Sequence, residues 1–300
     1  MAQRPIRLKP NGGSALNYSP GAAILPEIVP LAATKLILLC PEPALQLDAQ
    51  RLAAQLQLPL LRHLPAATEL YLRYDRAGLA LAAGGPNAQG VLRADFTTAR
   101  HRYRHRHALQ QELLAKALGI KRHSLTIWDV TAGLGQDAWV LASLGHTVHL
   151  FERHPIIHAL LTDGLTRART INGDESARQI LARMQLTLAN SLDILTGDHT
   201  PAPDVVYLDP MFPEKRKNAK AKKAMQYFQC LVGEDPDSAD LLAAALPRAT
   251  YRVIVKRPVK APPLSPQPPS AQLHGKTIRF DIYARQSAKR YLEEKNSQMR

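Results

Sequence analysis

A glycine-rich turn between two apolar runs constrains the fold of this 300-residue chain more than any other stretch. Residues 126–130 are apolar enough for a buried strand, Gly133 and Gly135 follow, and apolar residues at helical spacing run from Ala138 to Leu144. Glycine allows a tight reversal and lets a ligand approach the backbone. Since the first N–H groups of a helix face such a ligand, the stretch predicts a nucleotide-binding strand, turn and helix.

The class of nucleotide is left open by this turn. Gly133, Gly135 and Ala138 fit the G-x-G-x-x-G/A pattern, which is shared by nicotinamide-binding folds and S-adenosylmethionine sites. Glu152 ends the apolar run 147–151, about 20 residues further on, where a carboxylate accepts hydrogen bonds from ribose hydroxyls. Both cofactors contain a ribose, and a glycine turn without any ligand is the plain alternative.

A second turn favours S-adenosylmethionine. The buried-strand run 205–208 leads into Asp209-Pro-Met-Phe-Pro213, which has the Asp/Asn-Pro-x-aromatic form of enzymes that methylate exocyclic amino groups. We expect Asp209 to accept hydrogen bonds from the amino group, Pro210 to fix the backbone and Phe212 to stack on the base. A hydride-transfer enzyme has no use for this set. Both turns follow strands, where open α/β sheets bind ligands, although an ordinary proline-rich turn is the alternative.

The charge balance favours a polyanionic partner. Lysine and arginine exceed aspartate and glutamate by 39 to 25, so the net charge is +14. Such an excess indicates nucleic acid first and an anionic membrane surface second. Two basic runs are candidates for phosphate contacts, with a solvated linker or helix face as the alternative for each. Their candidate residues are Arg102, Arg104 and Arg106 around Tyr103, and Lys215, Arg216, Lys217, Lys222 and Lys223 directly after the second turn.

The sequence favours a cytoplasmic protein without a metal. No apolar run approaches the length of a membrane span. Cys40 and Cys230 are isolated thiols without metal-ligand spacing, which fits a reducing compartment. We therefore expect neither a membrane partner nor a metal site.

Three segments are predicted along the chain. Residues 1–30 are rich in proline and glycine and basic at the start, which is typical of a flexible tail. Residues 31–98 predict a small α/β domain with a strand at 36–39, a helix at 44–58, a hairpin at 70–83 and a strand at 91–96. Residues 99–300 predict a catalytic domain with a helix at 109–118, another from Pro155, and strands at 126–130, 147–151, 186–189, 205–208, 252–256 and 276–283. Such alternation indicates an α/β fold whose mostly parallel sheet has helices on both faces.

These motifs together resemble the RsmJ-type 16S ribosomal RNA methyltransferases over about residues 109–283. The stretches that resemble the family are Asp129-Val-Thr-Ala-Gly-Leu-Gly-Gln-Asp-Ala138, Phe151-Glu-Arg153, Leu160-Leu-Thr-Asp-Gly-Leu165, Val205-Val-Tyr-Leu-Asp-Pro-Met-Phe-Pro213 and Val255-Lys-Arg-Pro258. The resemblance implies a Rossmann-like fold that binds S-adenosylmethionine. It also implies methylation of a guanine N2 in bacterial small-subunit ribosomal RNA, with this RNA or the small ribosomal subunit as partner.

The resemblance also implies which side chains line the cofactor site. In addition to Gly133 and Gly135, these are Gln136, Asp137, Glu152, Arg153, Asn190, Ser191 and Asp209. Gln136 stands where the family usually has arginine, and Asn190 suits a helix N-cap as well as an adenine contact. Two other functions use the same residues: an adenine-N6 methyltransferase, and a non-catalytic RNA-binding protein with a decayed cofactor site.

Overall fold

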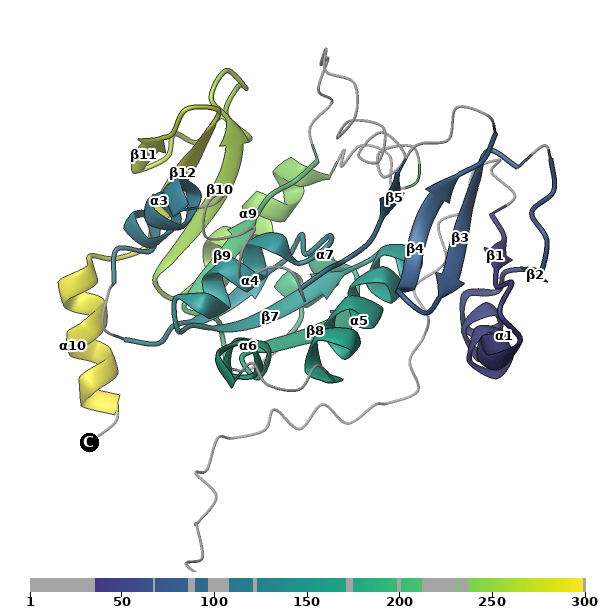
Figure 1. Cartoon of the computed structure of the whole chain (residues 1–300). Coiled ribbons are helices and arrows are strands. Elements are labelled where there is room, and N and C mark those ends of the chain that lie inside the picture. The colour runs from purple at the N-terminus through teal and green to yellow at the C-terminus, as the bar shows by residue number, and fades with distance from the viewer. Residues whose placement is uncertain are drawn as a thin grey trace, which may run out of the picture. The chain divides into compact units, whose positions relative to one another are not determined.

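The computed structural model describes most of the chain from residue 36 to residue 298 (Figure 1). The described ranges are 36–66, 68–85, 90–96, 108–120, 123–170, 175–198, 201–211, 231 and 237–298. The flexible tail predicted for residues 1–30 lies outside them. No helix in these ranges is long and apolar enough to cross a membrane.

The larger of two sheets has seven strands in the order β11-β12-β10-β9-β6-β7-β8. Neighbouring strands from β10 to β8 run parallel, whereas β12 and β11 are antiparallel to their neighbours. The prediction of a mostly parallel sheet is therefore confirmed. The strands are β6 (Thr126–Asp129), β7 (Thr147–Glu152), β8 (Met184–Leu188), β9 (Val205–Leu208), β10 (Arg252–Pro258), β11 (Ala271–His274) and β12 (Ile278–Ala284).

Helices cover both faces of this sheet because its strands are apolar on both sides. Ile127 and Tyr207 belong to one buried cluster, whereas their strand neighbours Trp128 and Val206 belong to another. Helices α3, α4, α5 and α6 contribute to the first cluster, and α7 and α9 contribute to the second. The helices are α3 (Ala108–Leu118), α4 (Gln136–Ser143), α5 (Pro155–Thr170), α6 (Glu175–Leu181), α7 (Ser191–Thr196), α9 (Ser238–Arg248) and α10 (Ala288–Gln298).

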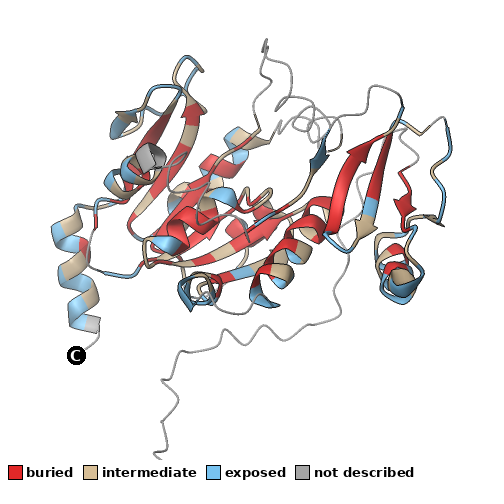
Figure 2. Cartoon of the chain, in the orientation of Figure 1, coloured by how far each residue is buried: buried red, intermediate tan, exposed pale blue. Residues whose placement is uncertain are grey.

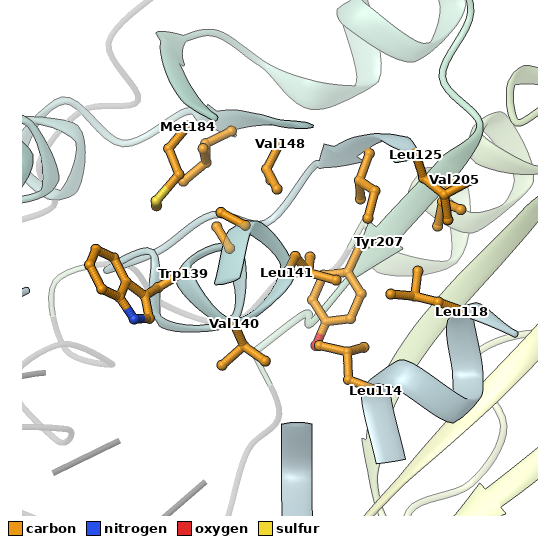
Figure 3. Close-up of a cluster of buried hydrophobic side chains, with 14 of the residues drawn as sticks. Leu114, Leu118, Leu125, Trp139, Val140, Leu141, Val148, Met184, Val205 and Tyr207 are labelled. Atoms are coloured by element: carbon orange, nitrogen blue, oxygen red, sulfur yellow. The ribbon is translucent and has the colours of Figure 1, made fainter. Parts of the chain in front are cut away.

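The first cluster consists largely of aliphatic side chains, and Figure 3 shows the part of it around Tyr207. Tyr207 from β9 lies with Leu114 and Leu118 of α3, and Trp139 of α4 stacks on Phe96 with 5.3 Å between ring centroids. Figure 2 shows this interior as a continuous buried band along the central strands, with exposed residues on the outer sides of the helices.

The smaller sheet has five strands in the order β2-β1-β3-β4-β5. Its elements are β1 (Leu38–Leu39), η1 (Pro43–Leu45), α1 (Gln46–Leu56), β2 (Leu60–Leu61), β3 (Leu70–Asp75), β4 (Gly78–Ala83) and β5 (Val91–Leu92). The predicted hairpin is present, with Asp75 opposite Gly78, but the last strand is shorter than the predicted 91–96. Ile156, Ile157 and Leu160 of α5 complete the core of this sheet. The domain boundary near residue 98 stays a prediction.

Candidate active site

A pocket opens at the edge where the parallel strands end. The register pairs Asp129 with Tyr207 and Leu208 with Val255, so β6 and β9 end side by side next to the middle of β10, which continues to Pro258. Side chains that follow these strands therefore converge, as expected for an open α/β sheet. The pocket is lined by Val130, Thr131, Gly133, Phe151, Glu152, Arg153, Asn190, Ser191, Asp209, Met211 and Leu241.

The two glycines of the first turn have different tasks. Both adopt left-handed backbone conformations, with φ of 52° at Gly133 and 74° at Gly135. Gly133 lines the pocket, whereas Gly135 is the N-cap of α4. A Cβ atom at Gly135 would lie 2.8 Å from Leu161 Cδ1 and 3.2 Å from the Phe96 ring. Gly135 is therefore required by packing as well as by its backbone conformation.

Glu152 closes the turn from the end of β7. The residue is only 8% exposed, and its Oε2 accepts a hydrogen bond from the Gly133 N–H at 2.9 Å. Its Oε1 accepts the N–H of His154 at 2.7 Å. The carboxylate thus fixes the backbone of the glycine turn and places negative charge in the pocket.

Three further lining residues hold the ends of their elements. Asn190 caps α7 by accepting the Leu192 N–H at 3.1 Å, which confirms the N-cap interpretation, and it also lines the pocket. Ser191 Oγ donates to the carbonyl of Val130 at 2.6 Å. Arg153 Nη1 lies 2.6 Å from Asp237 Oδ2, directly before α9. The wall of the pocket is thereby connected across four elements.

Asp209 belongs to a polar group that we call the lysine–carboxylate cluster, formed by Asp129, Asp137, Tyr207, Asp209 and Lys256. Lys256 Nζ lies 2.8 Å from Asp209 Oδ2 and 2.8 Å from Asp137 Oδ2. The Tyr207 hydroxyl donates to the same Asp137 oxygen at 2.6 Å. The Asp209 N–H donates to Thr131 Oγ1 at 2.6 Å, which ties the two turns together.

The charges of this cluster are strongly perturbed. Burial, with a smaller contribution from Asp137, raises the pKa of Asp129 to about 8. Burial alone would lower the pKa of Lys256, but Asp137 and Asp209 outweigh it and raise that pKa above its ordinary value. Lys256 is therefore a cation at neutral pH. Perturbed carboxyls beside a pocket are typical of functional sites.

Comparisons with known proteins agree with this geometry. Residues 51–285 match the model of the family described as "Putative SAM-dependent methyltransferase". The ribosomal RNA small subunit methyltransferase J of Thioalkalivibrio sulfidiphilus is 50% identical over 238 residues, which are 78% of this chain and 92% of the relative. The chain belongs to this methyltransferase J family. The enzyme of the same name from Pseudomonas fluorescens is 44% identical over 82% of this chain and 94% of its own length.

A solved structure of a related protein has a similar fold. The crystal structure of a SAM-dependent methyltransferase from Neisseria gonorrhoeae has a TM-score of 0.66 and 34% identity, and covers 86% of this chain and 98% of that one. The Rossmann-like methyltransferase fold predicted from the sequence is thus confirmed.

S-adenosylmethionine, the cofactor of the methyltransferase J family, suits the residues of the pocket. Val130, Phe151 and Leu241 provide an apolar wall, as an adenine ring requires. Glu152 and Asp209 provide carboxylates, which complement a cofactor that carries positive charge. No group of three or more histidine, cysteine or acidic residues in the described ranges could hold a metal ion.

The predicted site residues separate into three sets. Gly133, Glu152, Arg153, Asn190, Ser191 and Asp209 line the pocket together. The remaining described candidates lie elsewhere: Gln136 is exposed, Pro210 and Gly135 are buried, and Asp137 is held within the lysine–carboxylate cluster. The other candidates lie outside the described residues, and they are Phe212, Arg102, Arg104, Arg106, Lys215, Arg216, Lys217, Lys222 and Lys223.

The sequence interpretation missed Lys256, Tyr207 and Thr131 as site residues. Lys256 follows the apolar residues of β10 near the end of the strand. The stretch 255–258 contributed to the family resemblance, but the resemblance gave Lys256 no role in the site. A charged residue at the carboxyl end of a buried parallel strand is a signal that could have identified it.

Proposed function

We propose that this chain transfers a methyl group from S-adenosylmethionine to the exocyclic N2 of a guanine in bacterial 16S ribosomal RNA. The observation that carries the proposal is that Asp209 lines the same pocket as Gly133 and Glu152. An acceptor for an amino group thereby adjoins the residues suited to the cofactor. The names of the relatives favour small-subunit ribosomal RNA over an adenine-N6 substrate or a non-catalytic role.

The cofactor would be held by residues from the ends of three strands. We infer that Glu152 accepts hydrogen bonds from ribose hydroxyls and that Gly133 allows close backbone approach. Arg153, Asn190 and Ser191 would complete the wall. When bound, S-adenosylmethionine supplies an activated methyl group on a positively charged sulfur.

The chemical task of the chain is mainly to position a poor nucleophile. The lone pair of a guanine amino group is delocalised into the ring, so the nitrogen must be held in line for attack. Asp209 would accept the amino hydrogens as the nitrogen becomes tetrahedral and gains positive charge, assisted by the carbonyl of Pro210. Such a contact stabilises the transition state more than the ground state. Phe212 would stack on the extruded base.

The RNA and the compartment follow from the same proposal. The two basic runs, residues 100–107 and 214–223, are expected to contact phosphates, and the net charge of +14 supports this. The partner would be ribosomal RNA or the small ribosomal subunit, and the chain would act in the cytoplasm.

Methyl transfer from labelled cofactor to isolated RNAs tests the proposal. The label should map to a guanine N2 of small-subunit RNA by mass spectrometry. Asp209→Ala should lower the single-turnover rate at saturating cofactor by on the order of 10²–10³. Asp198→Ala, which removes an exposed carboxylate, serves as control. Label on adenine N6, or cofactor binding without transfer to any RNA, would overturn the proposal.

A further inference from the structure

We propose that Lys256 is a positioning residue for methyl transfer, because it binds one oxygen of the Asp209 carboxylate, and this carboxylate lines the pocket where the substrate amine would lie. The inference rests on the proposed function and deepens it. Lys256 comes from β10, 47 residues beyond Asp209 in sequence. The parallel register pairs Leu208 with Val255, so the residues that follow, Asp209 and Lys256, are brought side by side.

The two carboxylates that Lys256 joins are not equivalent. The Asp137 side chain is 11% exposed and also accepts the Tyr207 hydroxyl, so it is the anchored partner. The Asp209 side chain is 39% exposed and lines the pocket, so it is the accessible partner. Lys256 therefore connects a fixed buried group to the carboxylate that would meet the substrate.

The charge of Lys256 also controls the ionisation of Asp209. The ionisable groups around its ammonium are Asp129, Asp137, Asp209 and Tyr207, and the neighbouring Arg257 donates to the Pro262 carbonyl. Although part of its side chain is exposed, loss of water around the carboxyl group raises the pKa of Asp209, and the charge of Lys256 is the largest effect that opposes this rise. Without Lys256, neighbouring carboxyls would favour a protonated Asp209, which accepts hydrogen bonds poorly.

Stability alone gives little reason to place a lysine here. A buried ion pair is often replaced by apolar residues without loss of stability, because its desolvation cost offsets the attraction between the charges. Lys256→Met keeps the apolar stem of the side chain but removes the cation shared by Asp137 and Asp209. Because the loss of one partner from a buried pair lowers stability, this variant tests the role in the site under conditions where urea unfolding shows it to be folded.

The first measurement is the pH dependence of single-turnover methyl transfer at saturating cofactor. For Lys256→Met, the acid limb of the profile should move upward by about 1–3 pH units. Each pH unit of that shift lowers the rate on the acid limb about tenfold. Lys256→Arg should restore part of the rate because it keeps the charge. Lys260→Met, which removes an exposed lysine from the same region, should leave the profile unchanged. An unshifted profile in folded Lys256→Met overturns the proposal.

The second measurement does not require activity. Carboxyl carbon NMR follows the titration of Asp209, assigned with Asp209→Asn, in the wild type and in Lys256→Met. The midpoint should rise by about 1–3 pH units in the variant. An unchanged midpoint overturns the role of Lys256 even if the wild type methylates no RNA, an outcome that by itself would overturn only the proposed function. If Lys256→Met does not fold, Lys256→Gln replaces it in both measurements.

Discussion

At the scale of single residues, Glu152 combines a structural and a binding task. Its two carboxylate oxygens accept the backbone N–H groups of Gly133 and His154. We expect Glu152→Ala to weaken S-adenosylmethionine binding by about 1.5–3 kcal/mol, the range for hydrogen bonds to a charged group, and to lower the free energy of unfolding by at least about 1.5 kcal/mol, because two such bonds to the backbone are lost. Calorimetry and urea unfolding measure the two effects. Glu152→Gln keeps the size of the side chain and one acceptor oxygen. We therefore expect it to lower the free energy of unfolding less than Glu152→Ala does, while it still weakens cofactor binding. An unchanged dissociation constant in folded Glu152→Ala would remove this residue from the site.

Asp129 makes the stability of the fold depend on pH. The folded-state pKa of Asp129 is about 8, whereas an unfolded aspartate titrates near 3.9. Between these values the folded chain keeps a proton that the unfolded chain has released. Asp129 therefore lowers the free energy of unfolding as the pH rises from about 4 to about 8.

Asp129→Asn should remove this pH dependence, because an amide does not titrate but keeps the acceptor for the Thr131 N–H. Urea unfolding near pH 5 and near pH 8 is the measurement. The gain in stability of the variant over the wild type should be larger at the higher pH. If the free energies of unfolding of the two proteins change equally between about pH 5 and about pH 8, Asp129 does not hold a proton in the folded state.

At the scale of elements, helix α4 is bounded by two glycines in left-handed conformations, and they offer a matched pair of substitutions. Gly135→Ala should cost about 1–2 kcal/mol for its backbone conformation, plus about 1–3 kcal/mol for overpacking against Leu161 and Phe96. Gly145→Ala meets no atom within 4 Å, so it should cost only the first amount. Chemical unfolding of both variants checks the difference. Equal losses would mean that the core yields to the added methyl group.

Local sequence patterns predicted the elements better than the contacts between them. The turn at Gly133, the start of α5 at Pro155 and the hairpin of β3 and β4 are each encoded by neighbouring residues, and each is present. Strands β2 and β11 were missed, because short runs at the edge of a sheet carry little periodic signal. Lys256 was missed for another reason. Its partner is set by the register of β10 on β9, which no local pattern contains.

At the scale of the whole molecule, the excess of positive charge is expected to serve RNA binding. Neutralising Lys215, Arg216, Lys217, Lys222 and Lys223 should lower RNA affinity and reduce the log–log salt slope by up to about 3.5, since each phosphate contact to a single strand contributes about 0.7. Cofactor affinity should not change. Filter binding across a range of salt concentrations measures the slope.

The control for this prediction is a second set of five cations. The set takes exposed residues from loops next to both sheets and from α10: Arg62, Lys260, Lys276, Arg285 and Lys289. Their neutralisation removes the same net charge, so it isolates the contribution of position. Equal losses of affinity in the two sets would indicate a general electrostatic attraction and no localised contact by the run at 214–223.

Helix α5 belongs to two cores, and this makes the two sheets interdependent. Its residues Ile156, Ile157 and Leu160 pack against the smaller sheet, whereas Leu161 and Leu165 pack into the larger one. Deleting the first 95 residues would leave the former set in water and invite aggregation. Cooperative melting is the corresponding expectation: amide hydrogens of β4 and β7 should exchange with solvent through the same global opening. Because α5 contributes to both cores, exchanging the small sheet for an unrelated domain by recombination would expose apolar residues of α5. The two sheets are therefore expected to evolve as one unit.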